Sequence, residues 1–152
     1  MSPARAVATW FGCGLSPVAP GTVGTLGALP LAYGLHLLGP VAYWAGTALV
    51  TLGGTWAAER TARELGEKDP QSVVVDEVAG ALIAIGLASV GGFWACAFAI
   101  VLFRLLDILK PGAIDSAQHL KPFGVGIMAD DVLAGAIAGI VARFVAPLSQ
   151  SF

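Results

Sequence analysis

Long apolar stretches, interrupted by glycine and proline rather than by charge, form the dominant pattern along this chain. No Asp, Glu, Lys or Arg occurs in residues 6–58, a run of 53, or in residues 78–103, a run of 26. Uncharged runs of this length are typical of segments that lie in a lipid bilayer. The pattern therefore predicts an all-α fold, in which residues 1–152 form a single membrane-embedded domain.

Glycine and proline divide the apolar stretches into about five expected helices. These helices extend over residues 25–38, 41–58, 76–90, 93–109 and 130–145, and a polar extension over residues 59–65 continues the second. The Gly- and Pro-rich N-terminal segment from Phe11 to Gly24 is expected to form a loop, as is the connection that leads from Pro111 to Gly126. Several of the helices are shorter than the roughly 20 residues that cross a bilayer, so local thinning or burial within the bundle is expected.

The order of turns and helices assigns each connection to one end of the bundle. If every apolar helix crosses once, the turns at Gly39-Pro40 and Gly91-Gly92 share one end, and segments 59–77 and 104–131 share the other. The N-terminal loop falls at this second end as well. Basic residues are concentrated there, namely Arg60, Arg63, Lys68, Arg104, Lys110 and Lys121. The positive-inside rule therefore places this end in the cytoplasm.

Composition excludes several other classes of protein. Charged residues make up only 12% of the chain, against about 25% in a soluble domain. The net charge is −2 and there is no basic run, so no nucleic-acid partner is expected. Cys13 and Cys96 are isolated, without the spacing of a zinc site or a disulfide framework.

Five carboxylates stand out against this apolar background, in three clusters that all fall at the cytoplasmic end. They are Asp76, Glu77, Asp107, Asp130 and Asp131. Acids within membrane segments usually bind a cation or a polar partner, and carboxylate oxygens are ligands that suit Mg²⁺. Helix capping is an alternative for the two acid pairs, which precede or open helices. Capping does not explain Asp107, because the helix dipole disfavours an acid near a C-terminus.

Basic residues lie close to these acids in the sequence. Arg104 is three residues before Asp107, so the two share a helix face. They either form a simple ion pair or combine a metal ligand with a guanidinium that binds phosphate oxygens. Lys110 ends the same helix and either supplies a second cation or pairs with the helix dipole and lipid headgroups.

The N-terminal loop offers a third element of an anion site. In the segment 15–25, glycines leave backbone N–H groups free to converge on an anion, and a helix follows. Ser16, Gly21 and Thr22 are the candidate donors, although a plain turn explains the same composition. Cys13 is a weak candidate nucleophile, because Ala19 stands where a Cys-x5-Arg phosphate loop has its arginine.

Four segments, taken in order, resemble one known family. They are FGCGLSPVAPGTVGT from Phe11, VVVDEVAG from Val73, FRLLDILKP from Phe103 and GVGIMADDVLAG from Gly124. Together they are similar to the phosphatidylglycerophosphatase A family. The resemblance implies a multi-pass helical protein of the bacterial inner membrane. It also implies a Mg²⁺-dependent phosphatase that converts phosphatidylglycerophosphate to phosphatidylglycerol in glycerophospholipid biosynthesis.

The resemblance also implies roles for individual residues. The acids of the family match the five carboxylates, as catalytic residues and metal ligands, and its phosphate-binding positions match Arg104, Lys110, Ser16, Gly21 and Thr22. The stretch 113–123 departs from familiar members. We expect metal-assisted hydrolysis of a lipid phosphate, with one acid acting either as base toward water or as a nucleophile. A cation transporter and a non-catalytic membrane subunit are alternatives, and the sequence does not indicate an oligomeric state.

Overall fold

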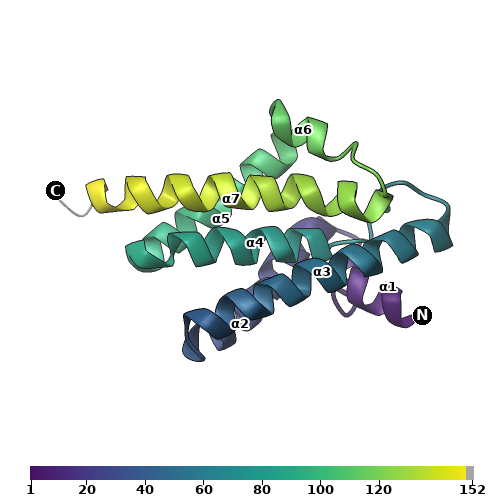
Figure 1. Cartoon of the computed structure of the whole chain (residues 1–152), viewed down its shortest axis with the longest axis horizontal. Coiled ribbons are helices and arrows are strands. Elements are labelled where there is room, and N and C mark those ends of the chain that lie inside the picture. Colours follow the sequence, from purple (N-terminus) through teal and green to yellow (C-terminus); the bar gives the residue numbers. More distant parts are fainter. Residues whose placement is uncertain (150–152) are drawn as a thin grey trace.

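The computed structural model describes residues 1–149, so positions 150–152 of the predicted domain lie outside the described residues. The fold is all-α, and the longer helices run roughly along one axis of an elongated bundle (Figure 1). The helices are α1 (Pro3–Ala8), α2 (Pro20–Leu37), α3 (Pro40–Leu65), α4 (Val75–Ala88), α5 (Gly92–Leu109), α6 (Ala113–Ala117) and α7 (Phe123–Ser149), with 3₁₀ turns η1 (Cys13–Leu15) and η2 (Ser89–Gly91).

Helix α4 forms the centre of the bundle, where it packs against α2, α3, α5 and α7. Its contact with α7 is a backbone contact, made possible by glycine. A Cβ atom on Gly135 of α7 would lie 2.3 Å from the carbonyl oxygen of Gly80 on α4, and one on Gly139 would lie 2.7 Å from that of Ala84. Small residues therefore allow the backbones of these two helices to approach closely.

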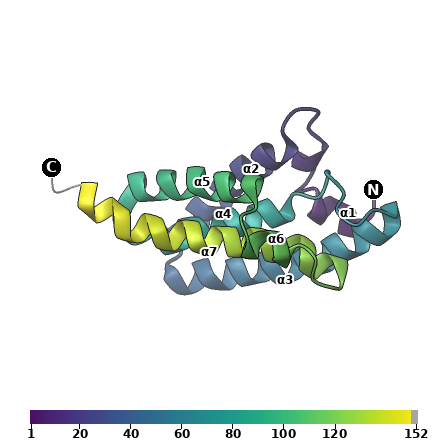
Figure 2. The same ribbon diagram turned by 90° about the horizontal axis from the view of Figure 1, so that it is seen from above.

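The connections are divided between the two ends of the bundle, as the counting of crossings predicts. The α2–α3 turn and the α4–α5 turn lie at one end, and the α3–α4 connection lies at the other (Figures 1 and 2). Helix α6 and the segment that follows it lie toward this second end, which brings distant parts of the sequence together there (Figure 2).

Two helices begin earlier than the sequence pattern predicts. Helix α7 begins at Phe123, not near Asp130, and α2 begins at Pro20 within the predicted loop. Proline suits the first turn of a helix because it has no N–H to leave unpaired. Gly124 and Gly126 suggested a loop, but a Cβ on either would lie within 2.6 Å of a carbonyl oxygen on a packed neighbour. These glycines therefore serve close packing and not a turn.

Short helices also occur within the two predicted loops, because η1 lies inside the Gly- and Pro-rich segment and α6 interrupts the connection after α5. Helix α1 lies before that segment, in residues for which no element was predicted. The polar extension of the second predicted helix is confirmed, because α3 continues without a break to Leu65. The bounds of α4 and α5 agree with prediction to within two residues.

The outside of the bundle is strongly apolar. Leu49 on α3, Trp94 on α5 and Phe144 on α7 are each about 70% exposed or more. Leu26, Tyr33 and Leu37 on α2 are 56–68% exposed. Contiguous apolar surface of this kind marks a lipid or protein contact. By length and composition, two segments are able to cross a membrane, Val75–Leu109 and Phe123–Val145.

Candidate functional site

A cavity of about 690 Å³ opens at the end of the bundle that carries the α3–α4 connection. Its walls come from the first turn of α2, the α3–α4 connection, the start of α4, the end of α5, the segment before α7 and the first turns of α7 itself. All five carboxylates singled out from the sequence line it, as do Arg104 and Lys110. The folded chain therefore collects these charges from three helices, α4, α5 with its C-cap, and α7, around one space.

The five acids form two overlapping groups of three. Carboxylate oxygens of Asp76, Glu77 and Asp131 lie within 4.8 Å of one another, and so do those of Asp107, Asp130 and Asp131. Asp131 belongs to both groups. Its side chain is only 2% exposed, and Asp130 is 3% exposed. The arrangement offers two adjacent sets of oxygen ligands that share one residue.

Several of these oxygens have no partner within the described part of the protein. Asp76 Oδ1, Glu77 Oε2 and Asp131 Oδ2 are buried and accept no hydrogen bond. Burying an unpaired carboxylate costs several kcal/mol, whereas a cation among such oxygens removes the penalty. Hard oxygen ligands at this spacing fit a divalent ion such as Mg²⁺. The donor set therefore has the chemistry that a metal site needs.

Helix packing explains where the acids stand. Asp76 and Glu77 lie in the first turn of α4, and Asp107 lies in the last turn of α5. Asp130 and Asp131 lie more than one turn inside α7, because that helix begins at Phe123. The capping alternative is therefore wrong for this last pair. It remains open for the pair on α4, which is close to free N–H groups.

Two cations neutralise part of this negative charge. Arg104 Nη1 donates to Asp107 Oδ2 at 2.7 Å and lies 3.9 Å from Glu77 Oε1, so the intrahelical ion pair exists within the site. Lys110 Nζ lies 2.5 Å from Asp130 Oδ2. Burial alone would lower the pKa of Lys110, but its hydrogen bond to Asp130 and the nearby acids outweigh that effect and raise the pKa. Lys110 therefore carries its charge at neutral pH.

The N-terminal segment contributes through its helical part and not through its loop. Gly21 and Thr22 lie in the first turn of α2 and line the cavity. A Cβ on Gly21 would lie 2.3 Å from Glu77 Oε1 and 3.0 Å from Arg104 Nη2, so glycine lets α2 approach this pair without displacing either side chain. Ser16 is not among the residues that line the cavity, and its hydroxyl donates to the carbonyl oxygen of Val18 at 2.9 Å.

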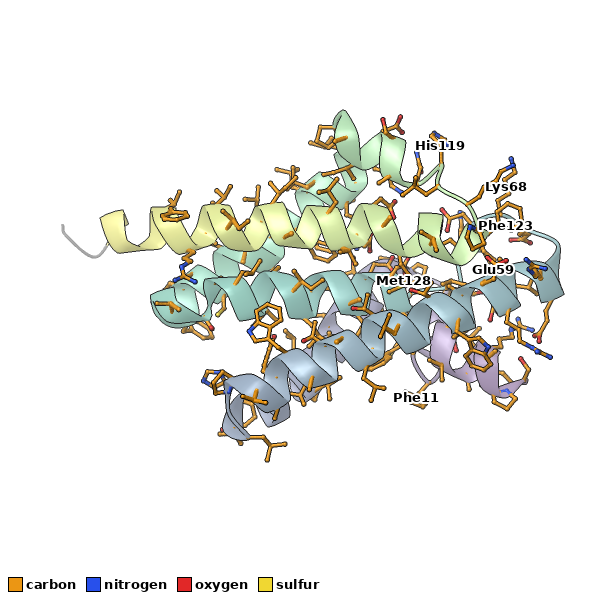
Figure 3. All side chains as sticks on the ribbon, viewed as in Figure 1. Phe11, Glu59, Lys68, His119, Phe123 and Met128 are labelled. Atoms are coloured by element: carbon orange, nitrogen blue, oxygen red, sulfur yellow. The ribbon has the colours of Figure 1, made fainter. Side chains whose placement is uncertain are left out.

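Several lining residues could not be found by sequence reasoning. Lys68 of the α3–α4 connection and His119 and Lys121 of the segment before α7 line the outer part of the cavity. Figure 3 shows Lys68 and His119 beyond the start of α7, near Phe123. Gln118 accepts a hydrogen bond from Lys110 Nζ at 3.3 Å. Their only sequence signal is a polar composition, which is also typical of an exposed loop.

Comparison with known proteins agrees with the resemblance of the four segments. The family model described as phosphatidylglycerophosphatase A matches residues 6–146. The chain is 35% identical to the phosphatidylglycerophosphatase A of Escherichia coli K12, over 95% of this chain and 84% of that protein. It is 39% identical to the protein of the same name from Haemophilus influenzae, over 93% and 87% of the two chains.

A relative with a different name is similar over the same length. The chain is 41% identical to a Bacteroides thetaiotaomicron protein whose name provisionally assigns it as a phosphatidylinositol-3-phosphatase, over 91% of this chain and 92% of that protein. No solved structure matches the chain. The relatives therefore agree on a phosphatase that acts on a phospholipid, and their names differ in the substrate.

Proposed function

Because the chain belongs to the phosphatidylglycerophosphatase A family, we propose that it is a Mg²⁺-dependent lipid phosphatase. Its proposed reaction is the hydrolysis of phosphatidylglycerophosphate to phosphatidylglycerol and phosphate. The observation that carries this proposal is the buried acid cluster, in which Asp131 joins two groups of three carboxylates beside Arg104.

The five acids are the proposed ligands for one or two Mg²⁺ ions. Asp76 and Glu77 would hold an ion on the α4 side, Asp107 and Asp130 would hold one on the α5 side, and Asp131 would serve both. When bound, Mg²⁺ supplies positive charge that polarises the phosphate and activates water. The unpartnered oxygens of Asp76, Glu77 and Asp131 support this assignment, because they are buried and ready to accept a cation.

The basic and N–H groups of the cavity are proposed to bind the phosphate group. The fork of donors on Arg104 matches two phosphate oxygens, and Asp107 holds the guanidinium in place at 2.7 Å. The free N–H groups of the first turn of α2, at Gly21 and Thr22, favour an anion at the same point. These groups offset the charge that develops as the phosphorus–oxygen bond of the ester breaks.

One carboxylate of the cluster is proposed to act either as a general base or as the nucleophile. In one route it accepts a proton from the attacking water, whose oxygen joins the phosphorus as the lipid alcohol leaves. In the other route it attacks the phosphorus itself and displaces the lipid alkoxide, which takes up a proton and leaves as the alcohol. Water then hydrolyses the acyl phosphate, which releases phosphate and restores the carboxylate. Both routes consume one water and release inorganic phosphate.

The apolar exterior supports a location in the bilayer. We propose a multi-pass protein of the inner membrane, with the cavity at its cytoplasmic end and the exposed apolar faces of α2, α3, α5 and α7 against lipid. A lipid substrate then keeps its acyl chains in the bilayer while its headgroup enters the cavity. Acids at one end of the bundle argue against a cation pathway, because transport sites usually lie near the midplane.

Phosphate release from purified protein in detergent micelles tests the proposal. We expect release from phosphatidylglycerophosphate with Mg²⁺, loss of release with EDTA, and recovery when Mg²⁺ is returned. Phosphatidylinositol 3-phosphate is the second substrate to compare, since it corresponds to the name of the Bacteroides relative. Turnover of that lipid alone would replace the proposed substrate, and no turnover of either lipid would refute a phosphatase.

A further inference from the structure

Three basic side chains that line the cavity have no role in the proposed chemistry. Lys68, His119 and Lys121 are exposed and line its outer part, whereas the acids are buried deeper in the bundle. Within residues 1–149, neither Lys68 nor Lys121 has an ion pair, although Arg104 and Lys110 each pair with an acid of the cluster. The outer part of the cavity therefore carries positive charge that no protein group neutralises through an ion pair.

These side chains come from two segments that meet only in the folded chain. Lys68 belongs to the α3–α4 connection, and His119 and Lys121 belong to the segment between α6 and α7 (Figure 3). Asp69 lines the same part of the cavity and offsets one of the two lysine charges. The remaining positive charge and the ring N–H of His119 suit an anion that carries a single negative charge.

We propose that Lys68, His119 and Lys121 form a second anion subsite, which binds the phosphodiester of the lipid substrate while its phosphomonoester lies at the acid cluster. This inference rests on the proposed function. It identifies the phosphodiester as the part of the substrate by which the enzyme selects its lipid. Both lipids suggested by the relatives carry a phosphodiester as well as a phosphomonoester. A cavity of about 690 Å³ is within the size range that encloses a small ligand, so it accommodates a headgroup with both phosphates.

The chemistry of the two basic residue types agrees with this division. Arginine binds a phosphomonoester with two parallel hydrogen bonds, and Arg104 lies among the acids. Lysine acts as a point charge on a flexible stem, which suits a diester that must be held without being cleaved. The two subsites together favour a lipid with two phosphates over a simple phosphate monoester or free phosphate.

The test compares wild-type protein with the double variant Lys68→Gln, Lys121→Gln in neutral detergent micelles. We expect KM for phosphatidylglycerophosphate to rise roughly fivefold, as the loss of two exposed ion pairs predicts, while kcat stays within twofold. Inorganic phosphate, added as a competitive inhibitor while the lipid product is measured, should keep its inhibition constant because it binds at the acid cluster alone. The variant Lys68→Arg, Lys121→Arg should restore KM.

Arg60→Gln is the matched control, since Arg60 lies at the same end of the bundle but does not line this cavity. An unchanged KM in the double glutamine variant would overturn the proposal. It would also be overturned if the inhibition constant of phosphate rose in parallel with KM, or if Arg60→Gln raised KM equally through general surface charge. Absence of phosphate release from wild-type protein is a different result, which refutes the proposed function and the subsite with it.

Discussion

A single methyl group at Gly21 provides a sharp test of the site. Replacing Gly21 with alanine places a Cβ 2.3 Å from Glu77 Oε1 and 3.0 Å from Arg104 Nη2. Ordinary contacts between carbon and these atoms exceed 3.0 Å, so the carboxylate must move by about 1 Å. Glu77 ends a flexible side chain, and the helix is therefore expected to keep its place while the carboxylate moves.

The size of the effect follows from this displacement. A misplacement of about 1 Å in a reacting constellation costs about 10²-fold in rate, or about 2.7 kcal/mol of transition-state stabilisation. The free energy of unfolding should change little. Alanine is a better helix former than glycine by up to about 1 kcal/mol, and this gain offsets the cost of moving the Glu77 side chain. We therefore expect Gly21→Ala to lower kcat/KM about a hundredfold in a protein that folds normally.

The assay is phosphate release with saturating Mg²⁺, alongside thermal unfolding in detergent. Gly34→Ala is the matched control in the same helix, since a Cβ there meets nothing within 4 Å. It should leave activity close to wild type and raise the free energy of unfolding by up to about 1 kcal/mol. Wild-type kcat/KM in Gly21→Ala would refute the reasoning, because Glu77 and Arg104 would then tolerate displacement without loss.

Three further substitutions test other parts of the structure. Asp131→Asn removes a charge that both acid groups share. Mg²⁺-dependent phosphate release should therefore fall at least 10³-fold, while the protein still inserts in membranes. Near-normal release would remove Asp131 from the site. Arg104→Lys keeps the charge but loses the forked donor geometry. We expect kcat in steady-state assays to fall about 10²-fold. Equal kcat values for the variant and wild-type protein would count against phosphate binding by Arg104. Glu59 Oε2 accepts the N–H of Gly124 at the start of α7 at 2.6 Å. Glu59→Gln keeps an acceptor oxygen but removes the charge that strengthens this hydrogen bond, so it should lower the free energy of unfolding by up to about 1 kcal/mol. That hydrogen bond lowers the pKa of Glu59 below its usual value of 4.5. Its contribution to stability is therefore present above pH 4.5 and is lost as pH falls through the lowered pKa. Denaturation of wild-type protein and Glu59→Gln at neutral and acidic pH measures this contribution, and a difference in the free energy of unfolding that persists in acid contradicts it.

The gathering of the acids could be predicted because it depends only on the direction of each helix. Apolar runs that reverse at Gly39-Pro40 and Gly91-Gly92 must bring segments 59–77 and 104–131 to one end, and the structure places them there. The ion pair of Arg104 with Asp107 also followed from helix spacing alone. Prediction succeeded where the cause lies within one helix or in the order of helices.

Other features depend on contacts between segments, which no periodicity reveals. Gly21, Gly124 and Gly126 were interpreted as loop residues, yet each lies in a helix. Gly124 and Gly126 pack against backbone carbonyl oxygens, and Gly21 packs against the side chains of Glu77 and Arg104. Lys68 and His119 line the cavity because two connections fold over it. The sequence places Lys68 at this end of the bundle but does not assign either residue to the cavity, since the path of a connection is fixed by the helices on which it packs.

The backbone contact of Gly80 with Gly135 has a consequence for how such a protein can diversify. The α4 and α7 backbones touch there, and this contact fixes the distance between Asp76 and Asp131. Substitutions of the surrounding side chains leave that distance unchanged. The segment between α5 and α7, by contrast, contributes to the cavity mainly through exposed side chains. Descendants of one ancestral scaffold can thus alter that segment, and with it the headgroup that the cavity is proposed to accept, while the spacing of the acid cluster is inherited unchanged.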